Sequence, residues 1–93
     1  MSYSKKSLGQ NFLIDNNIIR KIINLCEIKN KDIIEIGPGK GALTDEVLKK
    51  KPNSLILIEK DFKLVELLKS KYTNYKNVKI YNADILSFNI EKL

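Results

Sequence analysis

Histidine is absent from this sequence, and cysteine occurs only once, as Cys26. The first absence excludes histidine-based acid–base chemistry and histidine-ligated metal sites within these 93 residues. A single cysteine cannot close an internal disulfide or build a thiolate-rich zinc site. No apolar run approaches the length that crosses a bilayer, and residues 1–13 contain no long apolar stretch. We therefore expect no membrane span and no secretory signal, and a cytoplasmic protein, with an organellar compartment as the alternative.

Charge of one sign is in excess, because Lys and Arg total 17 against 11 Asp and Glu, which gives a net charge of +6. Such an excess favours contact with nucleic-acid phosphates. Solvated lysines on ordinary helix faces explain it equally well. Apolar residues make up 43% and charged residues 30%, which is typical of a folded domain, and the length allows one small domain. Composition therefore leaves nucleic-acid binding open.

Helical and strand patterns alternate along the chain. Apolar residues at helical spacing predict helices, and short runs of β-branched residues predict strands. The expected helices cover 16–27, 42–51 and 61–72, and the expected strands cover 32–36, 54–59 and 78–81. Right-handed crossovers would place these parallel strands in the order 3-2-1, with the sheet covered on both faces. The sequence therefore predicts the first half of a doubly wound, Rossmann-like α/β fold.

Two of the expected helices show this spacing clearly. In the first helix the residues that recur at helical spacing are Ile18, Ile19, Ile22, Ile23, Leu25 and Cys26. In the third, the residues that should face inward are Leu64, Val65, Leu67 and Leu68. Asp61 opens the third helix, and its carboxylate predicts an N-cap there.

The first expected strand is central in a complete doubly wound sheet, where a fourth strand pairs with its other side. The sequence ends at Leu93 without a fourth strand. Strand 32–36 is therefore expected to present a bare apolar edge, which predicts self-association. We expect a basic segment at 1–15, followed at 16–93 by the N-terminal half of a cofactor-binding domain, so that the chain is a fragment of a longer protein.

Glycine is scarce, with four residues, but three of them lie in the loop 37–41 (GPGKG), between an expected strand and an expected helix. An open α/β sheet binds its ligand at this edge, and glycines let the backbone approach a ligand closely. A plain turn needs fewer glycines. Read as Gly37-x-Gly39-x-x-Ala42, the loop matches the relaxed dinucleotide fingerprint. Read as Glu-x-Gly-x-Gly-x-Gly from Glu35, it resembles the loop of methyltransferases that use S-adenosylmethionine.

Two carboxylates follow at the ends of the next strands. Glu59 ends the second expected strand, where an acid can accept hydrogen bonds from both ribose hydroxyls of NAD or of S-adenosylmethionine alike, and would repel a ribose phosphate. Asp84 follows the third, where a carboxylate can accept a hydrogen bond from the exocyclic amine of adenine. The alternatives are an ordinary charged strand end for Glu59 and a turn cap for Asp84. Together with the glycine loop, these positions predict a nucleoside site.

Longer motifs resemble the ribosomal RNA adenine dimethyltransferases, which dimethylate two adjacent adenines near the 3′ end of small-subunit rRNA. Residues 6–13 (KSLGQNFL) look like the N-terminal motif of that family, and residues 35–44 (EIGPGKGALT) are similar to its cofactor loop. Residues 58–59 (IE) and 82–84 (NAD) match its next two motifs in order and spacing. The resemblance covers nearly the whole chain and extends to the antibiotic-resistance rRNA methyltransferases and the mitochondrial transcription-factor homologues.

This resemblance implies S-adenosylmethionine as the cofactor, the RNA of the immature small ribosomal subunit as the partner, and no metal. The cofactor-binding residues that it implies are Asn11, Leu13, Gly37, Gly39, Glu59 and Asp84. Asn11 and Leu13 would lie near the methionine part, the glycines against the cofactor, Glu59 on the ribose and Asp84 on the adenine amine. For Leu13 the alternative is a hydrophobic staple onto the first helix.

Basic residues such as Lys5, Lys6 and Arg20 are candidates for salt-dependent phosphate contacts. The catalytic motif of the family, Asn-Leu-Pro followed by Tyr or Phe, comes after strand 4, and a small helical RNA-binding domain follows it. Neither is found in these residues, so the resemblance assigns no catalytic residue, and we expect the chain alone to be inactive. Two alternatives remain open: a nucleic-acid-binding relative without catalysis, and an NAD-binding dehydrogenase domain, which leaves residues 10–13 unexplained.

Overall fold

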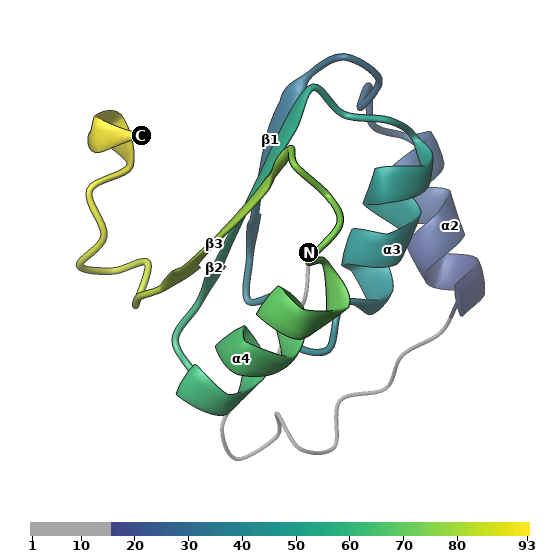
Figure 1. Cartoon of the computed structure of the whole chain (residues 1–93). Helices are drawn as coiled ribbons and strands as arrows, with labels where there is room; N and C mark the ends of the chain where they lie inside the picture. Colours follow the sequence, from purple (N-terminus) through teal and green to yellow (C-terminus); the bar gives the residue numbers. More distant parts are fainter. Residues whose placement is uncertain (1–15) are drawn as a thin grey trace.

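A computed structural model describes residues 16–93 of the chain (Figure 1). Along the chain the elements are α2 (Asn16–Asn24), β1 (Asp32–Ile36), α3 (Ala42–Lys49), β2 (Ser54–Glu59), α4 (Phe62–Lys71), β3 (Val78–Asn82) and a 3-10 turn, η1 (Ile90–Lys92). The expectations for Lys5, Lys6, Asn11 and Leu13 lie outside the described residues.

The three strands form one parallel sheet in the order β1-β2-β3, which confirms the predicted 3-2-1 arrangement. Ile34 is opposite Ile56 in the β1–β2 pair, and Leu57 is opposite Ile80 in the β2–β3 pair. The carboxyl ends of all three strands consequently meet at one edge of the sheet, the lower edge in Figure 1.

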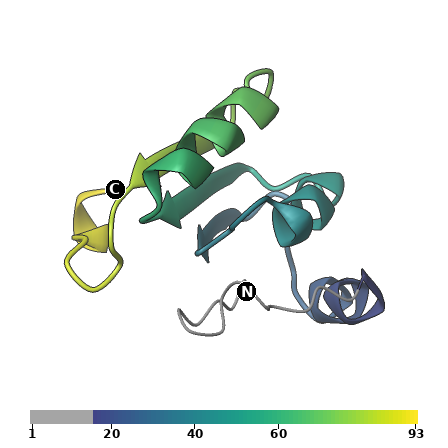
Figure 2. The same cartoon turned by 90° about the horizontal axis from the view of Figure 1, so that it is seen from below.

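The helices lie on a single face of the sheet (Figures 1 and 2), so the prediction of cover on both faces is wrong for the described chain. Leu55 and Leu57 point to the same side of β2, and both belong to one core cluster with Leu43 of α3 and Leu68 of α4. The physical reason is the direction of the crossovers. Two successive right-handed connections that step the same way along a sheet place both helices on the same face.

The core is centred on β2, where Leu55 and Leu57 are fully buried, and Ile23 joins α2 to it. The predicted helix 16–27 is too long, because α2 ends at Asn24. Of the residues beyond it, Leu25 is 87% exposed and Cys26 is also exposed. The inward assignment of Leu67 on α4 is likewise wrong, because its side chain is exposed.

The opposite face of the sheet carries Ile34 and Ile36 of β1, both exposed. β1 is also an edge strand of the described sheet, as expected. At the other side of this face, Tyr81 packs on Phe88 from the segment that follows β3, with ring centroids 5.3 Å apart. No helix within residues 16–93 is long and apolar enough to cross a membrane. The same residues contain no cluster of three or more potential metal ligands.

Candidate functional site

The glycine loop 37–41 leaves β1 at the carboxyl edge of the sheet and leads into α3. Its three glycines all have positive φ, from 60° at Gly39 to 94° at Gly41, the residue that caps the helix. A Cβ at Gly41 would overlap the Tyr72 hydroxyl, so this position needs glycine for space as well as for backbone angle. The loop is also fastened to the sheet, because Gly37 N donates to Ile58 O at 2.9 Å.

Glu59 is the last residue of β2, and its side chain is 7% exposed. One carboxylate oxygen, Oε1, accepts a hydrogen bond from Gly39 N at 3.2 Å, and the other accepts one from Asp61 N at 3.0 Å. The carboxylate thus joins the glycine loop to the start of α4, where Asp61 caps the helix as predicted. The structure therefore brings together two of the predicted site positions, Gly39 and Glu59, in direct contact.

Asp84 lies beyond β3 on the same edge, and its side chain is exposed. Its Oδ1 accepts a hydrogen bond from Leu86 N at 2.9 Å, so the carboxylate serves as a turn cap, the alternative that the sequence left open. The segment is held beside Glu59, because Ala83 N donates to Glu59 O at 3.0 Å. Asn82 Nδ2 donates to the same carbonyl at 3.1 Å. Asp84 is thus placed near the glutamate by its backbone, without a side-chain contact to the loop.

Glu35, the acid that opens the loop motif, points to the helix-covered face and is 5% exposed. The Thr44 hydroxyl donates to its Oε1 at 2.7 Å, while Oε2 is buried without a hydrogen-bond partner among the described residues. Burial raises the pKa of Glu35 above its usual 4.5, and the hydrogen bond from Thr44 opposes this shift. No sequence motif singled out Thr44 as the partner of Glu35. The available signal was strand alternation, which puts Glu35 on the same face as Ile33.

The pH dependence of stability should report on Glu35. Because its pKa is raised in the folded protein, its contribution to stability is complete below pH 4.5 and is lost as pH rises through the folded-state pKa. The free energy of unfolding of the wild-type chain, measured by urea denaturation, should therefore fall from pH 4.5 toward neutrality. Glu35→Gln should flatten this slope.

Asp32→Asn is the matched control for that experiment. Hydrogen bonds from Asn53 and Ser54 lower the pKa of Asp32, so its titration affects stability only below about pH 3.8. The slope above pH 4.5 should survive in Asp32→Asn. A slope that also survives in Glu35→Gln would show that Glu35 is not its source.

A second polar network ties the start of α3 to the end of α4. The Tyr72 hydroxyl lies 2.7 Å from Asp45 Oδ1 and 3.2 Å from Gly41 O. Lys71 Nζ donates to Asp45 Oδ2 and to Lys40 O, each at 2.9 Å. Burial first, and the adjacent Asp45 second, raise the pKa of Tyr72, which keeps the hydroxyl protonated as a donor. Through Lys40 and Gly41, this network holds the last residues of the glycine loop to the end of α4.

A parallel sheet with a glycine loop after β1 and a buried acid at the end of β2 defines a Rossmann-like nucleoside-binding fold. Comparison with known proteins specifies the family within this fold class. The family described as ribosomal RNA adenine dimethylase matches residues 1–93. The chain belongs to this family.

Curated relatives named ribosomal RNA small subunit methyltransferase A agree with this assignment. The protein of Pelagibacter ubique is 53% identical over 83 residues, which cover 89% of this chain and 31% of the relative. The protein of Mycoplasmopsis pulmonis is 47% identical over 96% of this chain and 34% of the relative. The chain thus spans about a third of the length of these relatives.

Solved structures show the same fold. The dimethyladenosine transferase from Plasmodium falciparum superposes with a TM-score of 0.75 at 30% identity, over 84% of this chain and 29% of that protein. The 23S rRNA methyltransferase ErmE gives a TM-score of 0.73 at 31% identity, over 85% and 32% of the two chains. The predicted fold class, a Rossmann-like methyltransferase fold, is confirmed.

Proposed function

We propose that this chain is the cofactor-binding portion of an S-adenosylmethionine-dependent methyltransferase that dimethylates the exocyclic amine of adenines in small-subunit rRNA. The observation that carries the proposal is the buried carboxylate of Glu59, held against Gly39 at the carboxyl edge of the sheet. The membership of the chain in the rRNA adenine dimethylase family supports the substrate. In this proposal residues 16–93 are the N-terminal half of the cofactor-binding domain, and residues 1–15 are a basic segment that precedes it.

The donor set at this edge fits an uncharged ribose better than a phosphate. The Gly39 N–H, which a pyrophosphate would require, already donates to the Glu59 carboxylate. An anion placed there would also meet the negative charge of that carboxylate. Each carboxylate oxygen of Glu59 accepts one backbone hydrogen bond and keeps lone-pair capacity for a hydroxyl group. This arrangement disfavours the NAD-binding alternative.

In the proposed site Gly37 and Gly39 lie against the cofactor, Glu59 accepts the ribose hydroxyls, and Asp84 accepts the adenine amine through its second oxygen. Asn11 and Leu13 complete the set from the N-terminal segment. When bound, S-adenosylmethionine supplies a methyl group on a positively charged sulfur. The residues of this chain hold and orient that group, which is the main contribution needed for a direct displacement. The target adenine must leave its stack to reach the edge.

Titration calorimetry tests the cofactor assignment. The chain should bind S-adenosylhomocysteine and should bind NADH more weakly, because the Gly39 N–H that a pyrophosphate would require already donates to the Glu59 carboxylate. Tighter binding of NADH would overturn the methyltransferase proposal. For the complete protein, methyl transfer from S-adenosylmethionine to small-subunit rRNA separates an enzyme from an RNA-binding relative that has lost catalysis.

A further inference from the structure

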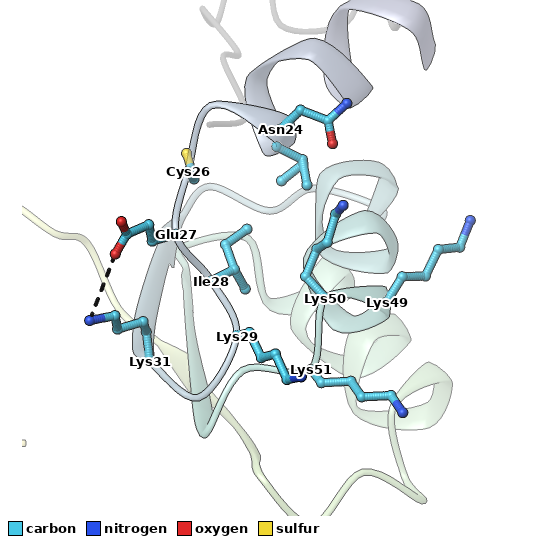
Figure 3. A pocket seen from close by; sticks show the side chains of 10 residues that line it. Asn24, Cys26, Glu27, Ile28, Lys29, Lys31, Lys49, Lys50 and Lys51 are labelled. Carbon is cyan, nitrogen blue, oxygen red and sulfur yellow. Dashed lines mark ion pairs between the residues drawn. The ribbon is translucent and has the colours of Figure 1, made fainter.

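A hollow of about 610 Å³ lies at the amino edge of the sheet, opposite the carboxyl edge that carries the proposed cofactor site (Figure 3). It is bounded by the end of α2, the loop 25–31 and the end of α3. The polar lining that matters here is lysine: Lys29, Lys31, Lys49, Lys50 and Lys51. We call this feature the basic hollow.

The positive charge of the basic hollow is largely uncompensated. Glu27 is the only acid in its lining among residues 16–93, and its ion pair with Lys31, at 4.0 Å, is long and exposed. Lys49 pairs with Glu46 at 2.9 Å. The other three lysines of the lining make no ion pair within residues 16–93; they are Lys29, Lys50 and Lys51. Three ammonium groups are therefore available to an anionic partner.

The backbone that carries these lysines is locked. Asn30 and Lys51 have φ values of 62° and 57°, in the left-handed region that non-glycine residues rarely adopt. They face each other, because Asn30 N donates to Lys51 O at 3.0 Å. Next to this bond, Asn53 N donates to Lys31 O at 2.8 Å. Two tight turns thus fix the backbone positions from which the lysines project, which lowers the entropic cost of binding a multivalent anion.

A second hollow, of about 650 Å³, provides a comparison within the same chain. Its lining contains Arg20 and Lys49, but also Asp45 and Glu46, so its charges are balanced. The excess of positive charge is therefore a property of the basic hollow, and the lysine-rich composition does not produce it at every depression of the surface.

We propose that the basic hollow binds phosphate groups of the substrate RNA at a second contact, separate from the edge that receives the target adenine. This inference rests on the proposed function, which supplies an RNA partner. Strands of five or six residues separate the two edges by about 17–20 Å. A folded RNA, with phosphates along its whole backbone, can span that distance and contact both.

The test measures binding of an RNA hairpin to the full chain over a range of salt concentrations. The triple variant Lys29→Gln/Lys50→Gln/Lys51→Gln should bind on the order of 10²-fold more weakly at about 0.1 M salt, with the slope of log affinity against log salt shallower by about two to three. The matched control is Lys69→Gln/Lys76→Gln/Lys92→Gln, which removes the same charge from exposed positions elsewhere. Equal weakening by the two triple variants would overturn the inference, since net charge alone would then explain binding.

Two further readouts keep the result decisive. S-adenosylhomocysteine should bind equally well to wild type and to the hollow variant, so failure of this inference leaves the cofactor proposal standing. In the wild-type chain, bound RNA should protect Lys29, Lys50 and Lys51 from acetylation. This measurement uses the wild-type chain alone, so it does not depend on whether a variant folds. Unprotected lysines in the RNA complex would contradict the proposed contact. If the wild-type chain bound neither RNA nor S-adenosylhomocysteine, the proposed function itself would fail.

Discussion

Replacing Glu59 by alanine should weaken binding of S-adenosylhomocysteine about 5- to 150-fold, equivalent to about 1–3 kcal/mol. In the proposed site, the change removes a charged acceptor for the ribose hydroxyls. It also leaves the Gly39 and Asp61 N–H groups without the carboxylate that now receives both of them. Calorimetric titration of both proteins measures the difference.

Glu66→Ala is the control for Glu59→Ala, because it removes the same charge from an exposed position on α4. It should leave the affinity unchanged. An S-adenosylhomocysteine analogue that lacks both ribose hydroxyls separates direct contact from loop positioning. If Glu59 binds the ribose, the analogue should bind equally weakly to wild type and to Glu59→Ala. Equal affinity of the two proteins for the natural ligand would remove Glu59 from the site.

Replacing Gly41 by alanine should lower the free energy of unfolding by about 2–4 kcal/mol. The methyl group would overlap the Tyr72 hydroxyl, and a φ of 94° is strained for any residue with a Cβ. The loss is measured by urea denaturation at a pH where Glu35 does not titrate. A change of less than about 0.5 kcal/mol, the range of ordinary surface substitutions, would contradict this explanation.

Tyr72→Phe tests which part of that loss is steric. In the Gly41→Ala background it removes the overlapping oxygen, so the double variant should be more stable than the sum of the two single changes predicts. The backbone strain at Gly41 would remain. If the two changes were additive, the Tyr72 hydroxyl would not be the group that excludes a side chain at Gly41.

The sequence predicted the sheet better than the helices that cover it. β1 and β2 match their expected bounds, 32–36 and 54–59, because β-branched runs between turn residues leave little choice of ends. Leu25 and Cys26 continue the helical spacing of α2, yet the chain turns before them and both are exposed. Hydrophobic periodicity shows where a helix lies, but it does not show at which residue tertiary packing ends that helix.

In the candidate site, too, some contacts could be predicted from the sequence and others could not. Contact between Gly39 and Glu59 follows from a general rule, that parallel strands end at a common edge, so strand order alone brings them together. The bond from Thr44 to Glu35 and the approach of Tyr72 to Gly41 depend on how α3 and α4 pack on one face. No local pattern encodes that packing, and sequence analysis had assigned the helices to both faces.

Because they donate to the carboxylate of Glu59, the backbone amides of Gly39 and Asp61 can report on ligand binding at the carboxyl edge of the sheet. Both N–H groups end on the same side chain, although one belongs to the loop after β1 and the other to the cap of α4. A ligand hydroxyl that donates a hydrogen bond to that carboxylate draws electron density from it, and should therefore alter the hydrogen bonds from both Gly39 N and Asp61 N. Nuclear magnetic resonance of these two backbone amides would therefore register occupancy of the proposed ribose position without a label on the ligand. A ligand that bound elsewhere on the chain would leave the two resonances unmoved.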